Sequence, residues 1–372
     1  MSAISAKKLR VGVIGCGKIS DAYFKTCKLY SSLEVVAAAD LDVSRAQAKA
    51  AEYGLAHAYT VDELLADASI DLVINLTIPQ AHAPVGLAAL RAGKHVYAEK
   101  PLSVTREEGQ SLLQAARDSG LRVGSAPDTF LGGGIQTCVK LIQDGWIGQP
   151  IGASAFMVGR GHEHWHPDPA FYYKAGGGPM FDMGPYYLTA LIAMLGPIRR
   201  VTGSVKTSYP QRTVLSQPKF GQLIDVEVAT HVTGVMDFHN GVTGTIITSF
   251  DAFGGADLPR IEIYGSEGTL KVPDPNTFGG PVFIRRKDAK DWSEIPLTHG
   301  FAENARGLGV LDMARAIAED RPHRASGELA YHVLEAMHGF HDASDQGKHY
   351  EMQSACDKPA PMPIGVSLEA FR

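Results

Sequence analysis

The stretch LRVGVIGCGKIS, residues 9–20, decides the fold of this chain. Residues 9–14 read as a short buried strand, and residues 19–30 read as a helix. Glycines at 15 and 17 permit a tight turn and let the backbone approach a pyrophosphate, which the helix start can bind through its N–H groups. Ser20 stands where such motifs usually have Gly or Ala, and it is small enough for close packing. The stretch therefore predicts a dinucleotide phosphate site made by Gly15, Cys16, Gly17, Lys18 and Ile19.

The second apolar segment, residues 34–39, ends in Asp40. A carboxylate at this position can accept hydrogen bonds from the adenosine ribose hydroxyls and repels a 2′-phosphate, so it predicts NAD as the cofactor. Arg45 follows five residues later and could reach a 2′-phosphate, which leaves NADP open. The alternative for Asp40 is that it only starts a turn or caps the next helix.

The chain changes texture after Pro127. Up to that point strands and helices alternate, which predicts a doubly wound parallel sheet with its ligand at the carboxyl ends of the strands. Beyond it, strand-like segments dominate, and Asn240-Gly241 predicts a type I′ hairpin turn between two of them. We expect a Rossmann domain over residues 1–127 and an α+β domain with a large open, mostly antiparallel sheet over residues 128–372. The expected strands of this second domain are 151–160, 200–209, 223–239, 242–250, 260–264 and 268–272.

Composition excludes several classes of function. A net charge of −5 and a pI near 6.3 argue against a nucleic-acid surface. No stretch approaches the roughly 18 apolar residues of a membrane span, and the first ten residues hold no apolar signal core. The four cysteines show no metal-site spacing and no disulfide density, so we expect a reducing, cytoplasmic location.

Three longer motifs resemble one family. They are TIPQAH at residues 77–82, AGKHVYAEKP at 92–101 and GGGPMFDMG at 176–184. Together they resemble the glucose–fructose oxidoreductase/inositol dehydrogenase/rhizopine catabolism (Gfo/Idh/MocA) family. The resemblance implies a Rossmann domain, an open-sheet domain that pairs subunits into homodimers or homotetramers, and hydride exchange at a sugar or polyol carbon. It also implies cofactor contacts from Thr77, Pro79, His82, Glu99 and Lys100.

The resemblance also implies that Lys100, Asp182 and Tyr186 are catalytic and bind the substrate. Oxidising an alcohol requires a proton acceptor within hydrogen-bond reach of the oxygen. A lysine ammonium can stabilise the developing negative charge, and residues four apart share a helix face. Because proline is tolerated in a first helical turn but not in a helix interior, Pro185 predicts either that their helix begins near Phe181 or that the Asp182–Tyr186 geometry is altered. Tyr187 is a competitor for the role of Tyr186, although it would face elsewhere.

Position 186 departs from the family, which usually has histidine there. Members resembling glucose–fructose oxidoreductase and D-xylose dehydrogenase use tyrosine, so we predict an NAD(P)-dependent sugar dehydrogenase acting at C1 of an aldose. The alternatives are an inositol, polyol or 3-keto-sugar-forming dehydrogenase and a redox-neutral NAD-dependent glycosidase, which would not accumulate NADH. A non-catalytic sensor is disfavoured because it needs no proton-transfer groups.

The segment GHEHWHPD, residues 161–168, is rich in histidine. We predict a substrate wall in which Trp165 covers a sugar face and His164 bonds hydroxyls, with His162 or Asp168 as other candidates. A zinc site is a weaker alternative: in an extended segment the alternate histidines would share a face, but the resembled family transfers hydride without metal. The remaining alternative is a loop ordered only by tryptophan packing.

Overall fold

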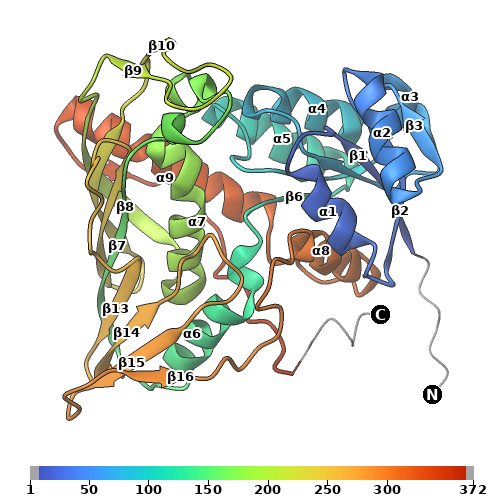
Figure 1. Ribbon diagram of the computed structural model, residues 1–372. Coiled ribbons are helices and arrows are strands. Elements are labelled where there is room, and N and C mark those ends of the chain that lie inside the picture. The colour runs from blue at the N-terminus through green and yellow to red at the C-terminus, as the bar shows by residue number, and fades with distance from the viewer. Residues whose placement is uncertain (1–7, 366–372) are drawn as a thin grey trace, which may run out of the picture. The chain divides into compact units, whose positions relative to one another are not determined.

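The computed structural model describes residues 8–365. These residues form two compact units (Figure 1). The first unit holds residues 8–132, 299–331 and 362–365, and the second holds 133–298 and 332–361. The predicted boundary after residue 127 lies close to the first observed division. The predicted second domain was continuous, whereas residues 299–331 belong to the first unit. None of the helices within residues 8–365 combines the length and apolar composition of a membrane span.

The first unit is built on a six-stranded parallel sheet with the order β3-β2-β1-β4-β5-β6. Strands β1 and β4 are neighbours although they are not consecutive, so the winding reverses between them. Ligands of doubly wound sheets bind beside the carboxyl ends of strands at this point. The strands are β1 (Leu9–Ile14), β2 (Leu33–Ala39), β3 (His57–Tyr59), β4 (Leu72–Asn75), β5 (His95–Ala98) and β6 (Val123–Ser125).

The helices of the first unit carry local signals that the sequence makes visible. Helix α5 starts with a capping box between Thr105 and Glu108 and ends at Gly120 in the left-handed conformation. The helices are α1 (Ser20–Cys27), α2 (Val43–Tyr53), α3 (Val61–Ala66), α4 (Pro79–Arg91), α5 (Arg106–Ser119) and α8 (Leu308–Ala318), with the 3-10 turn η1 (Thr129–Leu131).

The second unit is built on a nine-stranded sheet with the order β16-β15-β14-β13-β7-β12-β11-β8-β17. Neighbours are antiparallel except β7 and β12, which are parallel. The strands are β7 (Pro150–Val158), β8 (Ile198–Lys206), β11 (His231–Phe238), β12 (Thr243–Ser249), β13 (Ile261–Gly265), β14 (Gly268–Val272), β15 (Val282–Arg286), β16 (Ser293–Ile295) and β17 (Tyr350–Glu351). A separate ribbon pairs β9 (Gln211–Thr213) with β10 (Leu223–Asp225), so the predicted strand over 223–239 is two strands.

Helices cover one face of this sheet. Helix α7 (Gly178–Leu195) packs on β7, β11 and β12, and α6 (Gly133–Gln143) packs on β14 and β15 (Figure 1). Helix α9 (Gly327–Gln346) approaches so closely that a Cβ at Gly203 or Gly234 would lie 2.4 Å from Phe340. Side chains in β11 alternate between buried and exposed, which leaves the opposite face of the sheet exposed.

Two local predictions are wrong. Helix α7 begins at Gly178, before Phe181, and Pro185 lies inside it. Pro179 occupies the first turn, so the helix accommodates two prolines, and Pro185 has no N–H to donate to the carbonyl of Phe181. The hairpin at Asn240-Gly241 exists, but only Gly241 has a positive φ, of 88°. A type I′ turn needs positive φ at both positions, so the turn is of another type.

Candidate active site

The glycine turn joins β1 to α1 at the switch point of the first sheet. Gly15 has a φ of 101°, and a Cβ there would lie 2.6 Å from the carbonyl group of Leu76 on the neighbouring strand end. Around Gly17, an added Cβ would meet nothing within 4 Å. The backbone thus leaves open space in front of the start of α1, where Gly17 and Lys18 are exposed. This geometry fits a pyrophosphate, which the free N–H groups of a helix start attract.

Cys16 contributes backbone rather than a reactive thiol. Its side chain is 6% exposed, and its Sγ lies 3.6 Å from the carbonyl oxygen of Ala39. Burial, reinforced by the negative charge of Asp40, raises the pKa of Cys16 to about 11. The thiol therefore stays protonated at neutral pH.

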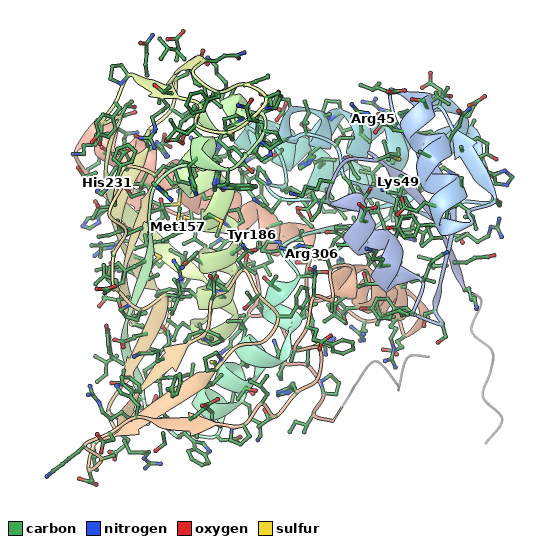
Figure 2. The ribbon with its side chains drawn as sticks, viewed as in Figure 1. Arg45, Lys49, Met157, Tyr186, His231 and Arg306 are labelled. Carbon is green, nitrogen blue, oxygen red and sulfur yellow. The ribbon has the colours of Figure 1, made fainter. Side chains whose placement is uncertain are left out.

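Asp40 follows β2 and is directed at the glycine turn. Its carboxylate accepts the backbone N–H of Cys16 at 2.8 Å and that of Asp42 at 3.0 Å. Arg45, on α2, pairs with Asp42 at 3.6 Å, and both side chains are more than half exposed (Figure 2). An exposed pair of this kind is weak. The Asp40 carboxylate is therefore held firmly beside the glycine turn, whereas Arg45 is free to turn toward another anion.

The loop after β4 is ordered by Asn75. This fully buried side chain accepts the hydroxyl of Thr77 at 2.6 Å and donates to the backbone carbonyl of His82 at 3.0 Å. His82 is 1% exposed, and its ring nitrogens lie 2.6 Å from the carbonyl oxygen of Pro101 and 3.0 Å from that of Thr77. Burial lowers the pKa of His82, and a neutral ring donates at only one of these two places. His82 can thus affect a cofactor only through the backbone that it holds. Pro79 begins α4 and is partly exposed.

Glu99 and Lys100 follow β5. The Glu99 carboxylate accepts the hydroxyl of Tyr23 at 2.8 Å and the backbone N–H of Lys100 at 3.0 Å. Burial raises the pKa of Tyr23 well above 10, so this phenol donates at all physiological pH values. Lys100 is half-buried at the carboxyl edge of the sheet, in the same edge as the glycine turn. Glu99 is therefore a fixed support for the backbone that carries Lys100.

Asp182 and Tyr186 lie one turn apart on α7, in the second unit (Figure 2 labels Tyr186). The Asp182 side chain is 14% exposed, and Tyr186 is 8% exposed. Asp182 Oδ2 lies 2.8 Å from Nε2 of His162. The structure therefore pairs Asp182 with a histidine twenty positions earlier in the chain.

The histidine segment is not extended. Residues His162–His164 form the 3-10 turn η2, so alternate histidines diverge. His162 points at Asp182, whereas Nδ1 of His164 lies 2.6 Å from the carbonyl oxygen of Gly161. Trp165 is 48% exposed beside His162. The same-face argument for zinc is therefore wrong, and residues 8–365 contain no group of three side chains placed to hold a metal.

Comparison with known proteins decides the family. Residues 9–126 match the oxidoreductase family with an NAD-binding Rossmann fold, and residues 135–271 match the GFO/IDH/MocA C-terminal domain. The chain belongs to the Gfo/Idh/MocA family. As the residues around Gly15 and Asp40 also fit the cofactor, it is an NAD(P)-dependent oxidoreductase.

Several relatives of this family member carry activities in their names. The chain is 28% identical to the dTDP-3,4-didehydro-2,6-dideoxy-alpha-D-glucose 3-reductase of Streptomyces antibioticus, over 89% of this chain and 93% of that protein. It is 29% identical to the D-glucoside 3-dehydrogenase of Escherichia coli, over 67% of this chain and 72% of that protein. An NAD binding oxidoreductase from Klebsiella pneumoniae shares its structure with a TM-score of 0.81 and 25% identity, over 94% of this chain and all of that one.

Sequence reasoning missed Asn75 and Arg212 and gave His162 no partner. Asn75 orders the Thr77 loop, and its only signal was a polar residue ending an apolar strand. His162 was one of several equal candidates until its distance to Asp182 was known. Arg212, 3% exposed, is bound to Glu163 beside His162, and no local pattern announces it.

Proposed function

We propose that this protein is an NAD-dependent sugar dehydrogenase that oxidises a ring hydroxyl. The choice of NAD as the cofactor rests on the carboxylate of Asp40, which accepts the N–H of Cys16 and is thereby held at the glycine turn. The choice of a sugar as the substrate rests on the relatives, whose names describe a dTDP-sugar reductase, a 1,5-anhydro-D-fructose reductase and a D-glucoside dehydrogenase.

The proposed division of labour follows from the residue types. Lys100 stabilises the alkoxide that forms as the substrate hydroxyl loses its proton. Tyr186 accepts that proton, and Asp182, one turn earlier on the same helix, bonds a substrate hydroxyl. NAD, when bound, supplies the hydride acceptor. Thr77, Pro79 and Glu99 with its backbone neighbours shape the nicotinamide side, and Trp165 offers an exposed ring to a sugar face.

Two ring positions are candidates for oxidation. Tyrosine at position 186 supports C1 of an aldose, through the branch that the chain resembles. The relatives named above support a secondary carbon, because their names place the chemistry at C3 in two cases. The two candidates differ in one testable respect, since only C1 is blocked in a methyl glycoside.

The test is a panel of free aldoses, their methyl glycosides and inositols with NAD and with NADP, followed by absorbance of the reduced nicotinamide. Oxidation of the aldose but not of its methyl glycoside supports C1. Oxidation of both supports a secondary carbon. Cleavage of a glycoside without accumulation of NADH would replace the proposal with the redox-neutral glycosidase.

Location and assembly are part of the same proposal. Cys16, Cys27, Cys138 and Cys356 form no disulfide with one another, which suits a reducing cytoplasm. The open face of the nine-stranded sheet suits pairing of subunits into a homodimer or homotetramer, with exposed Thr233, Val235 and Thr245 among the contact residues. Mass measurement in solution tests the assembly, and a monomer at micromolar concentration would refute it.

A further inference from the structure

We propose that His162 is a positioning residue that holds Asp182 as an oriented, ionised carboxylate, and that Trp165 fixes the tautomer in which it does so. The proposal rests on the proposed function only for its kinetic consequences. Its structural part concerns side chains of the second unit alone and can be tested without a substrate.

The hydrogen bonds of the imidazole define its tautomer. Nε2 lies 2.8 Å from Oδ2 of Asp182, and a carboxylate can only accept, so Nε2 carries the proton. Nδ1 accepts the indole N–H of Trp165 at 3.3 Å, and an indole can only donate, so Nδ1 is unprotonated. Both bonds are satisfied together only by the neutral Nε2–H ring. Trp165 therefore acts on Asp182 through His162.

Aromatic rings hold the imidazole in place. The centroid of His162 lies 4.1 Å from that of Tyr172 and 4.8 Å from that of Phe250, with Trp165 at 5.5 Å. The His162 side chain is 19% exposed. Rings on three sides limit rotation about the side-chain bonds, so the donor direction toward Asp182 is set before any substrate arrives.

A buried ionic cluster holds the backbone of the η2 turn in place. Arg212 donates to Glu163 at 3.0 Å, to Asp251 at 3.1 Å and to the carbonyl oxygen of Phe250 at 2.7 Å. Tyr173 donates its hydroxyl to the other oxygen of Glu163. Since Glu163 directly follows His162, this cluster fixes the turn against the end of the sheet, and the arginine fork leaves it little freedom.

The arrangement has a chemical consequence. A neutral imidazole donor stabilises the charged form of Asp182 and fixes one of its oxygens, so the carboxylate meets a sugar hydroxyl in one orientation. A doubly protonated His162 would carry a proton on Nδ1 and could not accept the indole N–H of Trp165. The ionisable groups around the ring are Asp182 on α7, Tyr172 in η3 (Ala170–Tyr173) and His166, which contacts both Trp165 and Tyr172.

The test compares two substitutions of one residue. His162→Phe keeps an aromatic ring but removes the donor, whereas His162→Gln places an amide N–H near the former Nε2. We expect His162→Phe to lower kcat/KM by about tenfold to a hundredfold, the usual range for losing a hydrogen bond to a charged group, with NADH affinity unchanged. His162→Gln should recover most of the loss. His239→Gln, at an exposed histidine in the β11–β12 turn, is the matched control and should behave as wild type.

A second readout is independent of activity. Nitrogen-15 spectra of histidine-labelled protein at pH 7 should contain a signal of a neutral Nε2–H ring that disappears in His162→Gln. His95 and His166, whose Nδ1 atoms also accept a backbone N–H, should give signals of the same kind that remain. Trp165→Phe removes the donor to Nδ1, so the Nδ1 signal of this ring should shift while its Nε2–H signal remains. A ring at His162 that is Nδ1–H or doubly protonated at pH 7 would overturn the inference, and so would equal losses in His162→Phe and His162→Gln. A wild-type protein that oxidises no sugar but shows the expected ring would refute the proposed function and leave the positioning pair intact.

Discussion

Replacing Asp40 with asparagine separates the charge of this side chain from its place in the fold. The Asp40 carboxylate accepts the N–H of Cys16 at 2.8 Å, and an asparagine carbonyl oxygen can accept the same bond. Asp40→Asn should therefore preserve the glycine turn while it removes the negative charge. Asp40→Ala removes both the negative charge and the acceptor for the Cys16 N–H, so it serves as the more severe variant.

The magnitude follows from two effects. A ribose hydroxyl bonded to a charged acceptor is worth about 1.5–3 kcal/mol, so NADH binding should weaken by about tenfold in Asp40→Asn, which keeps a neutral acceptor. A carboxylate about 4 Å from a phosphate charge repels it by about 1–4 kcal/mol between bulk water and a protein surface. Relief of that repulsion should strengthen NADPH binding by about tenfold or more. The preference for NADH over NADPH should thus fall by about a hundredfold, the product of the two changes.

Arg45 supplies the internal check. Its pairing with Asp42 is exposed and weak, so it can turn to a 2′-phosphate once Asp40 is neutral. Cofactor affinities are measured by the fluorescence of NADH and NADPH on titration with protein, which needs no substrate. The relief of repulsion does not depend on Arg45, so adding Arg45→Ala to Asp40→Asn should remove only the part of the NADPH gain that exceeds this relief. An Asp40→Asn protein with an unchanged ratio of NADH to NADPH affinity would refute the role given to this carboxylate.

Three further predictions concern proton transfer and stability. Lys100→Ala should bind NADH normally and lose turnover by about a hundredfold or more, and near-normal turnover on the true substrate would reject its role. Tyr186→Phe should keep the fold, lower oxidation strongly and remove one limb of the pH–rate profile, whereas an unaltered rate and profile would make this tyrosine a core residue. Burial raises the pKa of Asp128 from 3.8 to about 6. The backbone N–H groups of Gly309 and Gly307 donate to its carboxylate and only partly offset this rise. The native state therefore holds this proton more tightly than the unfolded state, so the contribution of Asp128 to the free energy of unfolding should fall by about 3 kcal/mol as pH rises from about 4 to above 6. Asp128→Asn should flatten that slope in urea titrations, and a slope equal to that of wild type would contradict the assignment.

The first sheet was predictable because its signals are local. The strand, glycine turn and helix start around Gly15 are consecutive in the chain, and the capping box at Thr105 marks its own helix. The carboxyl ends of parallel strands meet at one edge, so the placement of Asp40, Thr77 and Lys100 at that edge follows from topology.

The rest depended on contacts between distant segments. No local pattern reports that residues 299–331 belong to the first unit, or that His162 faces Asp182. The prediction of alternate histidines on one face assumed an extended chain, whereas the anchored Glu163 lies within a 3-10 turn. Pro185 argued for a later helix start, yet the helix runs from Gly178 through it, because packing of the flanking turns outweighs one lost hydrogen bond.

The most direct test of a sugar dehydrogenase is to follow the hydride itself. Once the panel has identified a substrate, the protein is given NAD and that sugar with deuterium at each ring carbon in turn, and the reduced nicotinamide is analysed by mass spectrometry. We predict one mass unit gained from a single ring carbon, with stoichiometric accumulation of the reduced cofactor. Failure to recover deuterium in the nicotinamide from any ring carbon, while the sugar is consumed, would contradict hydride transfer from a sugar as the activity of this protein.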